Sequence, residues 1–424
     1  MSLSCACPAL PLSRGAIFGW IGLAVVLACD AQLMEMQDGD NRPTSAVQEI
    51  DQLRALGYVD TSHSRADPRK MGAAVLDRSR VSPGYSLYTE PSVCSSALID
   101  LDGELVHTWR MTPCGGWMHA DLLPNGDLLI PALRPVDTVD AKTEKTKHYL
   151  LRMSWNGNVV WESDLPVHHD AESISGDKIL AITQNPRRVH SSGEVLEITD
   201  NAIAPLSSGG RLLDSISLWD TFRENPIGFK LKPVKPRKQQ DRINLFHANS
   251  VESIRPGPTT RHPLHSPNNV LVSMRNQDAV VIIDLARREL VWSWGSDTLE
   301  GPHDARVLAN GNILVFDNGI RRGWSRVLEV DPLSGSIAWH YGDPEEDRFF
   351  TRARGSSQRL PNGNTLISIS NTGEAREVTP EGEIVWRFWN PRLDEEGKRH
   401  VIIRMIRYTP EMIEPLLAGS HGPG

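Results

Sequence analysis

Several histidines of this chain precede short apolar runs and could act together on an anion. His169 and His303 both begin the sequence His-Asp-Ala, and in both cases Ile-Leu follows ten and eleven residues later. His247 lies in NLFHANSVESI, and Arg275 follows the next apolar run. Neutral imidazole is a good nucleophile near neutral pH, and the guanidinium fork suits sulfate or phosphate oxygens. These residues therefore predict a convergent pocket for an anionic group.

Two further histidines compete with His169 for a place in that pocket. His168 is adjacent to it, and His119, which begins HADLLPNGDLLI, lies one residue out of step with the His-Asp-Ala motifs. A single histidine at a strand end commonly bonds only a neighbouring turn. We therefore interpret His119 as structural and retain His169, with His168 and His119 as alternatives.

The stretch 301–319 indicates how one of these histidines is held. His303 comes seven residues before an Asn-Gly turn at 310–311, which a short apolar run follows. Asn-Gly between apolar runs is the strongest short-range signal for a β-hairpin, because both positions tolerate positive φ. Asp304 or Asp317 could orient the ring of His303, although a turn alone also explains the Asp-Asn-Gly sequence that starts at Asp317.

A repeated motif indicates the fold that must position these residues. Each copy has a polar turn, two or three aliphatic residues and a tryptophan. The tryptophans are Trp109, Trp161, Trp219, Trp292, Trp339 and Trp386. Repeated hairpins at a period of about 40–50 residues are the signature of a β-propeller with four strands per blade. The sequence therefore predicts an all-β, six-bladed β-propeller over residues 81–410.

A ring of blades must close on itself, because unpaired edge strands invite aggregation. The first copy of the repeat lacks its preceding strands, whereas the last is followed by HVIIRMIRYT at 400–409. We expect that strand to join GYSLYTE, which begins at Gly84, in one blade shared by the two ends of the ring.

The beginning of the chain has the pattern of an export signal. Arg14 precedes an apolar run over 15–28, which is short for a membrane span and typical of a signal peptide. The sequence VLAC that ends at Cys29 resembles a bacterial lipobox, and a signal peptide cut a few residues later is the alternative. We therefore expect residues 1–28 to be a signal peptide and the protein to be exported, periplasmic and lipid-anchored to the membrane through Cys29.

The remaining segments are assigned by pattern and by cysteine count. Residues 29–80 are polar and read as a short N-terminal tether with one helix, which Ser45 begins, and 411–424 as a C-terminal tail. Cys94 and Cys114 are the pair that remains once the signal and Cys29 are set aside. In an oxidising compartment we expect them to form a disulfide.

The composition excludes several classes of partner. With a formal net charge of −8 over 424 residues, the chain has no basic footprint for nucleic acid. It has no Gly-rich phosphate loop for a nucleotide donor, and its histidines show no HExxH or Cys-rich spacing. We therefore expect no cofactor and no required metal, although several converging histidines could still bind zinc or copper.

Three motifs, in order along the chain, resemble a known family. They are HANS at His247, SMRNQDAV around Arg275 and GPHDARVLANGNILVFDNG around His303. The chain is similar over about residues 82–410 to the bacterial arylsulfotransferase (aryl-sulfate sulfotransferase) family of periplasmic six-bladed propellers. It differs in having a short tether in place of a substantial N-terminal β-domain, so the family's dimer arrangement is not carried over and the oligomeric state stays open.

The resemblance implies a role for each pocket residue. His303 matches the nucleophile that accepts a sulfuryl group from an aryl sulfate and forms a sulfohistidine, which then passes the group to a phenol in a ping-pong reaction. His247 and Asn249 match the His-x-Asn pair of the pocket. Arg275 matches the arginine that grips the sulfate oxygens, and His169 the additional histidine.

Two other functions are compatible with the same residues. A propeller without catalytic activity could bind an anionic ligand or a protein partner at the same mouth, since this fold hosts many functions. A metal-assisted hydrolase is the third reading. We expect the sulfotransferase.

Overall fold

The computed structural model of the chain describes residues 61–135, 146–174, 178–191, 193–225, 227–235, 242–254 and 264–419. The chain separates into two compact units, Met1–Glu49 and Ile50–Gly424, and every described residue belongs to the second. The expected signal peptide, the lipid-bearing Cys29 and the helix begun by Ser45 lie outside the described residues.

The described residues form six sheets of four or five strands, all but one pair of neighbouring strands being antiparallel. Sheet 1 contains β29 (Met405–Tyr408), β3 (Tyr85–Glu90), β4 (Ser95–Ile99) and β5 (Leu105–Arg110). Sheet 2 contains β6 (Gly116–Trp117), β7 (Asp121–Leu122), β8 (Leu128–Pro135), β9 (Thr146–Met153) and β10 (Val159–Ser163). Sheet 3 contains β11 (Val167–Ile174), β12 (Lys178–Ser191), β13 (Glu194–Ser207), β14 (Ile216–Ser217) and the parallel β15 (Ile243–Asn244).

The second half of the chain follows the same plan. Sheet 4 contains β16 (Ala248–Ser253), β17 (Asn269–Met274), β18 (Ala279–Asp284) and β19 (Glu289–Trp294). Sheet 5 contains β20 (His303–Val307), β21 (Ile313–Asp317), β22 (Arg326–Val330) and β23 (Ile337–Tyr341). Sheet 6 contains β24 (Ser356–Arg359), β25 (Thr365–Ile369), β26 (Glu374–Val378), β27 (Ile384–Trp389) and β2 (Gly72–Leu76). A separate pair consists of β1 (Thr61–Arg65) and β28 (Lys398–His400).

Short helices connect or flank these sheets. They are α3 (Leu218–Arg223), α4 (Pro410–Gly419) and the 3-10 turns η1 (Arg275–Gln277) and η2 (Ser370–Thr372). None of the helices in the described ranges is both long and apolar enough to span a bilayer.

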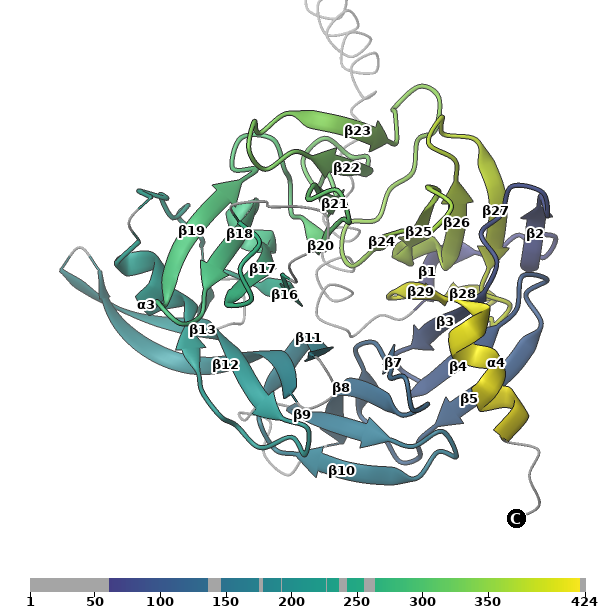
Figure 1. The fold of residues 1–424 in the computed structure, drawn as a ribbon, viewed down its shortest axis with the longest axis horizontal. Coiled ribbons are helices and arrows are strands. Elements are labelled where there is room, and N and C mark those ends of the chain that lie inside the picture. The colour runs from purple at the N-terminus through teal and green to yellow at the C-terminus, as the bar shows by residue number, and fades with distance from the viewer. Residues whose placement is uncertain are drawn as a thin grey trace, which may run out of the picture. The chain divides into compact units, whose positions relative to one another are not determined.

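The six sheets stand side by side around a common centre, as Figure 1 shows, and six hydrophobic clusters join each sheet to the next. Alternate side chains of a strand point to opposite faces of its sheet. In β21, Ile313 and Val315 therefore pack against sheet 4, whereas Leu314 and Phe316 pack against sheet 6. The prediction of an all-β propeller is confirmed.

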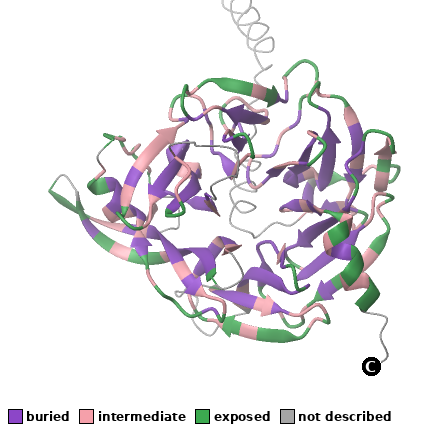
Figure 2. Ribbon diagram, in the orientation of Figure 1, coloured by how far each residue is buried: buried purple, intermediate pink, exposed green. Residues whose placement is uncertain are grey.

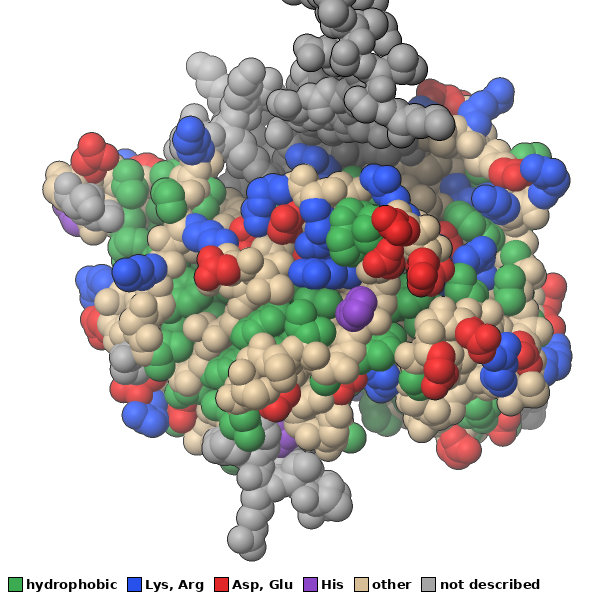
Figure 3. All heavy atoms as spheres, turned by 90° about the horizontal axis from the view of Figure 1, so that it is seen from above, with side chains coloured by type: hydrophobic (Ala, Val, Ile, Leu, Met, Phe, Trp, Pro, Cys, Tyr) green, Lys and Arg blue, Asp and Glu red, His purple; other side chains and the backbone are tan. Residues whose placement is uncertain are grey.

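Burial follows from this arrangement. Strands inside each sheet, such as β17 and β21, are buried along their whole length because both faces meet a neighbouring sheet. Outer strands such as β10 have no fully buried residue, and Figure 2 shows the buried strands toward the centre and the exposed ones at the outside. On the face in Figure 3, Lys and Arg side chains are interspersed with Asp and Glu.

The two ends of the propeller meet in sheet 1. Strand β29 pairs antiparallel with β3, with Met405 opposite Tyr88 and Tyr408 opposite Tyr85. The expected shared blade is confirmed. The expected disulfide between Cys94 and Cys114 is also present, and it joins the β3–β4 connection to the segment before β6.

Two predicted boundaries are wrong. Residues 61–80 are not part of a tether, since β1 pairs with β28 and β2 adds a fifth strand to sheet 6 beside β27. The TSHSR sequence of β1 has no apolar alternation, so no strand pattern marks it. The expected C-terminal tail over 411–424 is not separate from the propeller either, because α4 buries Ile413 in the hydrophobic cluster between sheets 1 and 2.

The closure of the ring contains a buried ion pair that we expect to be essential for stability. Arg407 of β29 lies 3.1 Å from Glu377 of β26, and the side chains are at most 1% exposed. Removing one member of such a pair leaves a buried charge and typically costs about 3–5 kcal/mol. Arg407→Met should therefore lower the free energy of unfolding in urea by that amount.

Two variants control this prediction. Arg188→Met removes a surface pair with Glu197, in which Arg188 is 80% exposed, and should change stability by less than about 1 kcal/mol. Arg407→Met combined with Glu377→Gln should recover a large part of the loss. A loss below about 1 kcal/mol for Arg407→Met alone would contradict the prediction.

Candidate active site

Residues at or near the innermost strands of all six sheets line one pocket at the centre of the ring. The pocket contains all five residues nominated from the sequence: His169, His247, Asn249, Arg275 and His303. The other lining residues are Met118, His119, Asp304, Ala353, Arg354, Gly355, Ile403 and Arg404. The structure thus brings the predicted residues together and adds charged groups that sequence analysis did not assign to the pocket.

Irregular backbone aims these side chains at the centre. Strands β11, β16 and β20 each have a register shift near their first residues, of the kind a β-bulge produces. Four non-glycine residues beside the pocket have positive φ: His169 (65°), His247 (49°), Asp304 (48°) and Arg354 (64°). Such backbone is strained by about 1–3 kcal/mol per residue and is concentrated at functional sites.

Hydrogen bonds determine which nitrogen of His303 carries the proton. Nδ1 lies 2.7 Å from the side-chain oxygen of Asn318 and 3.1 Å from the carbonyl oxygen of Gly301. Both partners are acceptors, so Nδ1 must donate. Nε2 accepts the backbone N–H of Arg354 at 3.2 Å, so Nε2 carries the lone pair. The ring is therefore the Nδ1–H tautomer.

His303 is also neutral at physiological pH. It is 8% exposed, and burial followed by the nearby charge of Arg275 lowers its pKa to about 3. The hydrogen bonds that His303 donates to Asn318 and Gly301 act in the opposite direction without offsetting this. An imidazole in this state has a lone pair at Nε2 that can attack an electrophile.

Neither aspartate proposed as the orienting group of His303 has that function. Asp304 accepts the backbone N–H of Ser357 at 2.9 Å and pairs with Arg306 at 2.8 Å. Asp317 accepts the backbone N–H of Glu300 at 2.8 Å and is paired with two arginines. The residue that orients His303 is Asn318, which directly follows β21 and contacts Nδ1 of the ring at 2.7 Å. The prediction of Asp304 or Asp317 in this role is therefore wrong.

A second asparagine sets the protons of the other two histidines. Asn244 accepts the backbone N–H of His247 through Oδ1 at 3.0 Å, so its amide nitrogen faces Nδ1 of His247 at 2.7 Å. His247 consequently accepts at Nδ1 and carries its proton on Nε2, which lies 3.0 Å from Nε2 of His169. Burial, followed by the nearness of the His247 ring, lowers the pKa of His169 well below its usual value.

The turn that carries Arg275 is tied to the strand that carries His247. The backbone N–H of Arg275 donates to the carbonyl of His247 at 3.2 Å, and that of Asn276 donates to Phe246 at 3.0 Å. The buried side chain of Gln277 donates to the carbonyl of Leu245 at 2.7 Å. Arg275 and His247 are therefore positioned as one unit of sheet 4.

The side chain of Asn249 is held through its amide nitrogen, and its Oδ1 atom accepts no hydrogen bond from the described residues. Its amide nitrogen donates to the carbonyl of Pro302 at 2.8 Å, which links sheet 4 to the segment that precedes His303. The side-chain oxygen without such a donor is buried. Asn249 thus positions the neighbouring segment and presents an acceptor at the pocket.

The two alternative histidines have different fates. His168 is outside the pocket, and its ring packs 3.8 Å from that of His169 and 4.9 Å from that of His148, centroid to centroid. Burial and these two neighbours lower the pKa of His168 well below its usual value. His119 does line the pocket, but as part of an ion-pair network.

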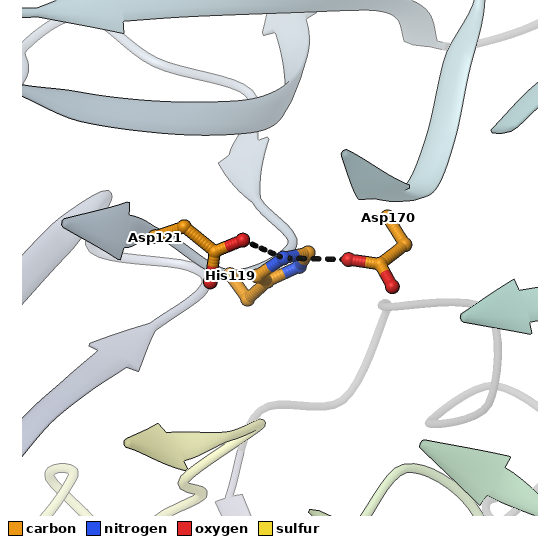
Figure 4. Close-up of side chains that lie close together, drawn as sticks. All are labelled: His119, Asp121 and Asp170. Atoms are coloured by element: carbon orange, nitrogen blue, oxygen red, sulfur yellow. Dashed lines mark ion pairs between the residues drawn. The ribbon is translucent and has the colours of Figure 1, made fainter. Parts of the chain in front are cut away.

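His119 lies between two carboxylates, as Figure 4 shows. Its Nε2 is 3.0 Å from Asp170 and 3.8 Å from Asp121. Burial and Arg404 act to lower the pKa of His119, but the neighbouring carboxylates of Asp121 and Asp170 outweigh them and raise it. The two carboxylates therefore favour the protonated form of His119.

The cluster of His119, Asp121 and Asp170 has donor atoms close enough to surround a metal ion. Its central carboxylate is already occupied, however. Asp170 Oδ1 receives Arg404 at 3.2 Å as well as His119, and Oδ2 accepts the backbone N–H of Val251 at 3.0 Å. These contacts account for the cluster as an ion-pair network that ties sheets 2, 3 and 4 together.

Arg404 is a buried charged group of the pocket. It comes from the residue before β29 and reaches Asp170 at 3.2 Å and Asp304 at 3.1 Å. Sequence analysis missed Arg404, since it lies outside every copy of the repeat. It also missed Arg354, although Gly355 next to it occupies the histidine position in the last copy, which was an available signal.

The sequence matches a family model described as arylsulfotransferase (ASST) over residues 148–391, which is more than half of the chain. No curated protein matches it. A solved structure of a protein of unknown function from Bacteroides caccae is 15% identical, with a TM-score of 0.43, over 76% of this chain and 98% of that one. A streptogramin B lyase structure is 12% identical, with a TM-score of 0.44, over 82% and 97%. The Swd1 β-propeller domain of Myceliophteria thermophila is 12% identical, with a TM-score of 0.39, over 77% and 88%.

The buried neutral histidines should make stability depend on pH. A histidine whose pKa is lowered by folding binds more protons when unfolded, so stability is lost as pH falls below the unfolded value of about 6.5. Each contributes a slope of about 1.4 kcal/mol per pH unit. His168→Phe should remove one such contribution, so the free energy of unfolding should fall less steeply from pH 6 to 5 than in the wild type.

The measurement is urea unfolding at each pH, and the difference between the two slopes isolates His168 from the other titrating groups. Equal slopes for the wild type and the variant would show that His168 is not buried as a neutral ring.

Proposed function

Because the chain belongs to the arylsulfotransferase family, we propose that it transfers a sulfuryl group from an aryl sulfate to a phenol through a covalent adduct on His303. The observation that carries the proposal is the state of that ring. Its Nδ1 is engaged by two acceptors, its lone pair is on Nε2, and Arg275 and Arg354 line the same pocket.

The first half-reaction forms the adduct. The Nε2 lone pair of His303 forms a bond to sulfur while the sulfur–oxygen bond to the aryl group breaks, and that electron pair leaves on the phenolate oxygen. Attack displaces the 3.2 Å contact from the backbone N–H of Arg354, which then lies beside the sulfuryl oxygens. Fixed donors of this kind stabilise charge that develops in a transition state.

The second half-reaction passes the group on. The hydroxyl oxygen of the acceptor phenol bonds to sulfur, and the nitrogen–sulfur electron pair returns to Nε2 of His303. The proton of that hydroxyl is taken up, by way of solvent, by the phenolate released in the first step. The two steps together are a ping-pong transfer that needs no net proton.

The pocket suits an anionic donor because its carboxylates are already paired with cationic side chains. The positive charge of Arg404 is balanced by Asp170 and Asp304, and His119 lies between Asp121 and Asp170. Arg275 and Arg354 add positive charge at the pocket, which His247 and the neutral rings of His169 and His303 also line. Such guanidinium groups match sulfate oxygens in geometry as well as in charge.

The test is transfer from 4-nitrophenyl sulfate to phenol, followed by release of nitrophenolate. His303→Ala should reduce turnover by at least about 10⁴-fold, because it removes the nucleophile itself. Mass spectrometry of the wild type after donor alone should show about 80 Da added at His303. His168→Phe is the matched control, since it removes a buried imidazole beside the pocket and should leave the adduct in place.

Full transfer by His303→Ala would exclude this assignment. A folded wild type that binds aryl sulfate without transfer and without an adduct would favour the alternative, a propeller that binds an anionic ligand or a protein partner.

We further propose that the protein is exported to the periplasm and anchored to the membrane by lipid on Cys29. The VLAC sequence that ends at Cys29 supports this proposal, as does the Cys94–Cys114 disulfide, which suits an oxidising compartment. Cys29→Ser should move the protein from the membrane fraction to the soluble periplasmic fraction of a bacterial host, with sulfuryl transfer retained. Unchanged membrane association would contradict lipid attachment at Cys29.

A further inference from the structure

Asn318 is held so firmly that only one of its atoms can face His303. Its amide nitrogen donates to the carbonyl oxygens of Thr351 at 2.7 Å and Arg354 at 2.8 Å. Those two bonds fix the orientation of the amide, because a carbonyl oxygen in that place would meet two acceptors. The side-chain oxygen of Asn318 therefore points at Nδ1 of His303, and Asn318 itself is completely buried.

The same contacts join the nucleophile to the segment that covers it. Arg354 donates its backbone N–H to Nε2 of His303 and accepts from Asn318 through its carbonyl. Arg354 thus forms hydrogen bonds both with the ring of His303, at Nε2, and with Asn318, which contacts the other ring nitrogen. Rotation or tautomer exchange of the ring would break contacts on Asn318 and Arg354 together.

We propose that Asn318 is a positioning residue that keeps a proton on Nδ1 of His303 through both half-reactions. The inference rests on the proposed function and adds a role that the pocket residues by themselves do not supply. Before attack, the amide oxygen selects the Nδ1–H tautomer and leaves the lone pair on Nε2. After attack, it keeps the Nδ1 proton in place on a ring that now carries the sulfuryl group.

The Nδ1 proton that is kept after attack determines how readily the sulfuryl group is transferred to the acceptor. With Nδ1 protonated, the adduct is an N-sulfoimidazolium, and breaking its nitrogen–sulfur bond returns a neutral imidazole, which is a good leaving group. Without that proton the leaving group would be an imidazolide anion, which leaves poorly. A neutral amide oxygen accepts a hydrogen bond but cannot take the proton itself, whereas a carboxylate can.

This chemistry explains why an amide, and not a carboxylate, stands behind the nucleophile. Sulfuryl attachment makes Nδ1–H much more acidic, so an aspartate at 318 would accept its proton and trap the adduct. A buried negative charge there would also oppose the anionic donor in a pocket of low dielectric. Asn318 avoids both effects.

The test uses the purified full chain with 4-nitrophenyl sulfate, first alone and then with phenol. Asn318→Asp should still give a burst of nitrophenolate, but its 80 Da adduct should decay at least about 10-fold more slowly on addition of phenol than that of the wild type. Asn318→Ala should lose about 10²-fold or more in the burst rate itself, because it removes the shorter of the two contacts that hold the Nδ1 proton and leaves the Gly301 carbonyl at 3.1 Å.

Asn371→Asp is the matched control. Asn371 is buried in the next sheet and accepts from Thr351 Oγ1 at 2.8 Å, so it holds the same segment without a hydrogen bond to His303 among the described residues. It should keep the burst and the adduct lifetime within about twofold of the wild type. Burst rates and adduct lifetimes that are the same in Asn318→Asp, Asn318→Ala and this control would overturn the proposal.

A measurement on the wild type does not depend on whether the variants fold. With ¹⁵N-labelled histidine, the His303 signals are identified as those missing from His303→Ala, and at pH 7 they should show a protonated Nδ1 and an unprotonated Nε2. The opposite tautomer would overturn the inference even if transfer through His303 is demonstrated. Conversely, transfer that persists in His303→Ala would refute the proposed nucleophile while leaving the tautomer measurement unaffected.

Discussion

The buried contact between Arg404 and the two carboxylates of Asp170 and Asp304 is the constraint on which the centre of this propeller depends. The three side chains come from sheets 1, 3 and 5, so the contact spans the ring. Each carboxylate also accepts a backbone N–H from the following sheet, at Val251 and at Ser357. A buried charge is tolerated only when it is paired and hydrogen-bonded, so none of these groups is stable there without the others. Because Arg404 directly precedes β29, the strand that closes the ring also completes this network.

The centre contains two groups of side chains, a network of paired charges and a set of neutral histidines. Carboxylates and their cationic partners neutralise one another around Asp170 and Asp304, and the same carboxylates raise the pKa of His119. The histidines of the second group are uncharged, since burial lowers the pKa of His169 and of His303. Uncharged rings with fixed tautomers can serve as a nucleophile and as hydrogen-bond donors. In the proposed reaction an anionic sulfate ester therefore meets arginine side chains and neutral imidazole rings. The carboxylate that lines the pocket, Asp304, is paired with Arg306 and Arg404.

Asparagines, and not aspartates, control the proton positions in the pocket. Asn318 acts on His303 and Asn244 on His247, and in each case backbone contacts orient the amide. A neighbouring aspartate is the more familiar partner of a catalytic histidine, and sequence reasoning accordingly considered Asp304 and Asp317. Those aspartates instead hold neighbouring backbone and pair with arginines. The role of Asn318 was not predictable from local pattern, because an Asn-Gly turn is fully explained by its backbone conformation. Asn244, at the end of β15, is part of no motif that the sequence analysis identified.

The repeat of tryptophan-terminated hairpins was sufficient to predict the all-β propeller and the blade shared by its two ends, since strand period and turn chemistry are local properties. The motifs nominated His169, His247 and His303 as one pocket with Arg275, because equivalent positions in a ring of repeats must converge. The family resemblance added Asn249. Strands without apolar alternation, such as β1, and the helix α4 were not predicted, since their stability comes from partners far away in the chain. Only the tertiary structure decided which histidines are charged, which nitrogen bears each proton, and that Arg354 and Arg404 join the pocket. Those properties depend on burial and on contacts between different sheets, and neither is encoded in any single stretch of sequence.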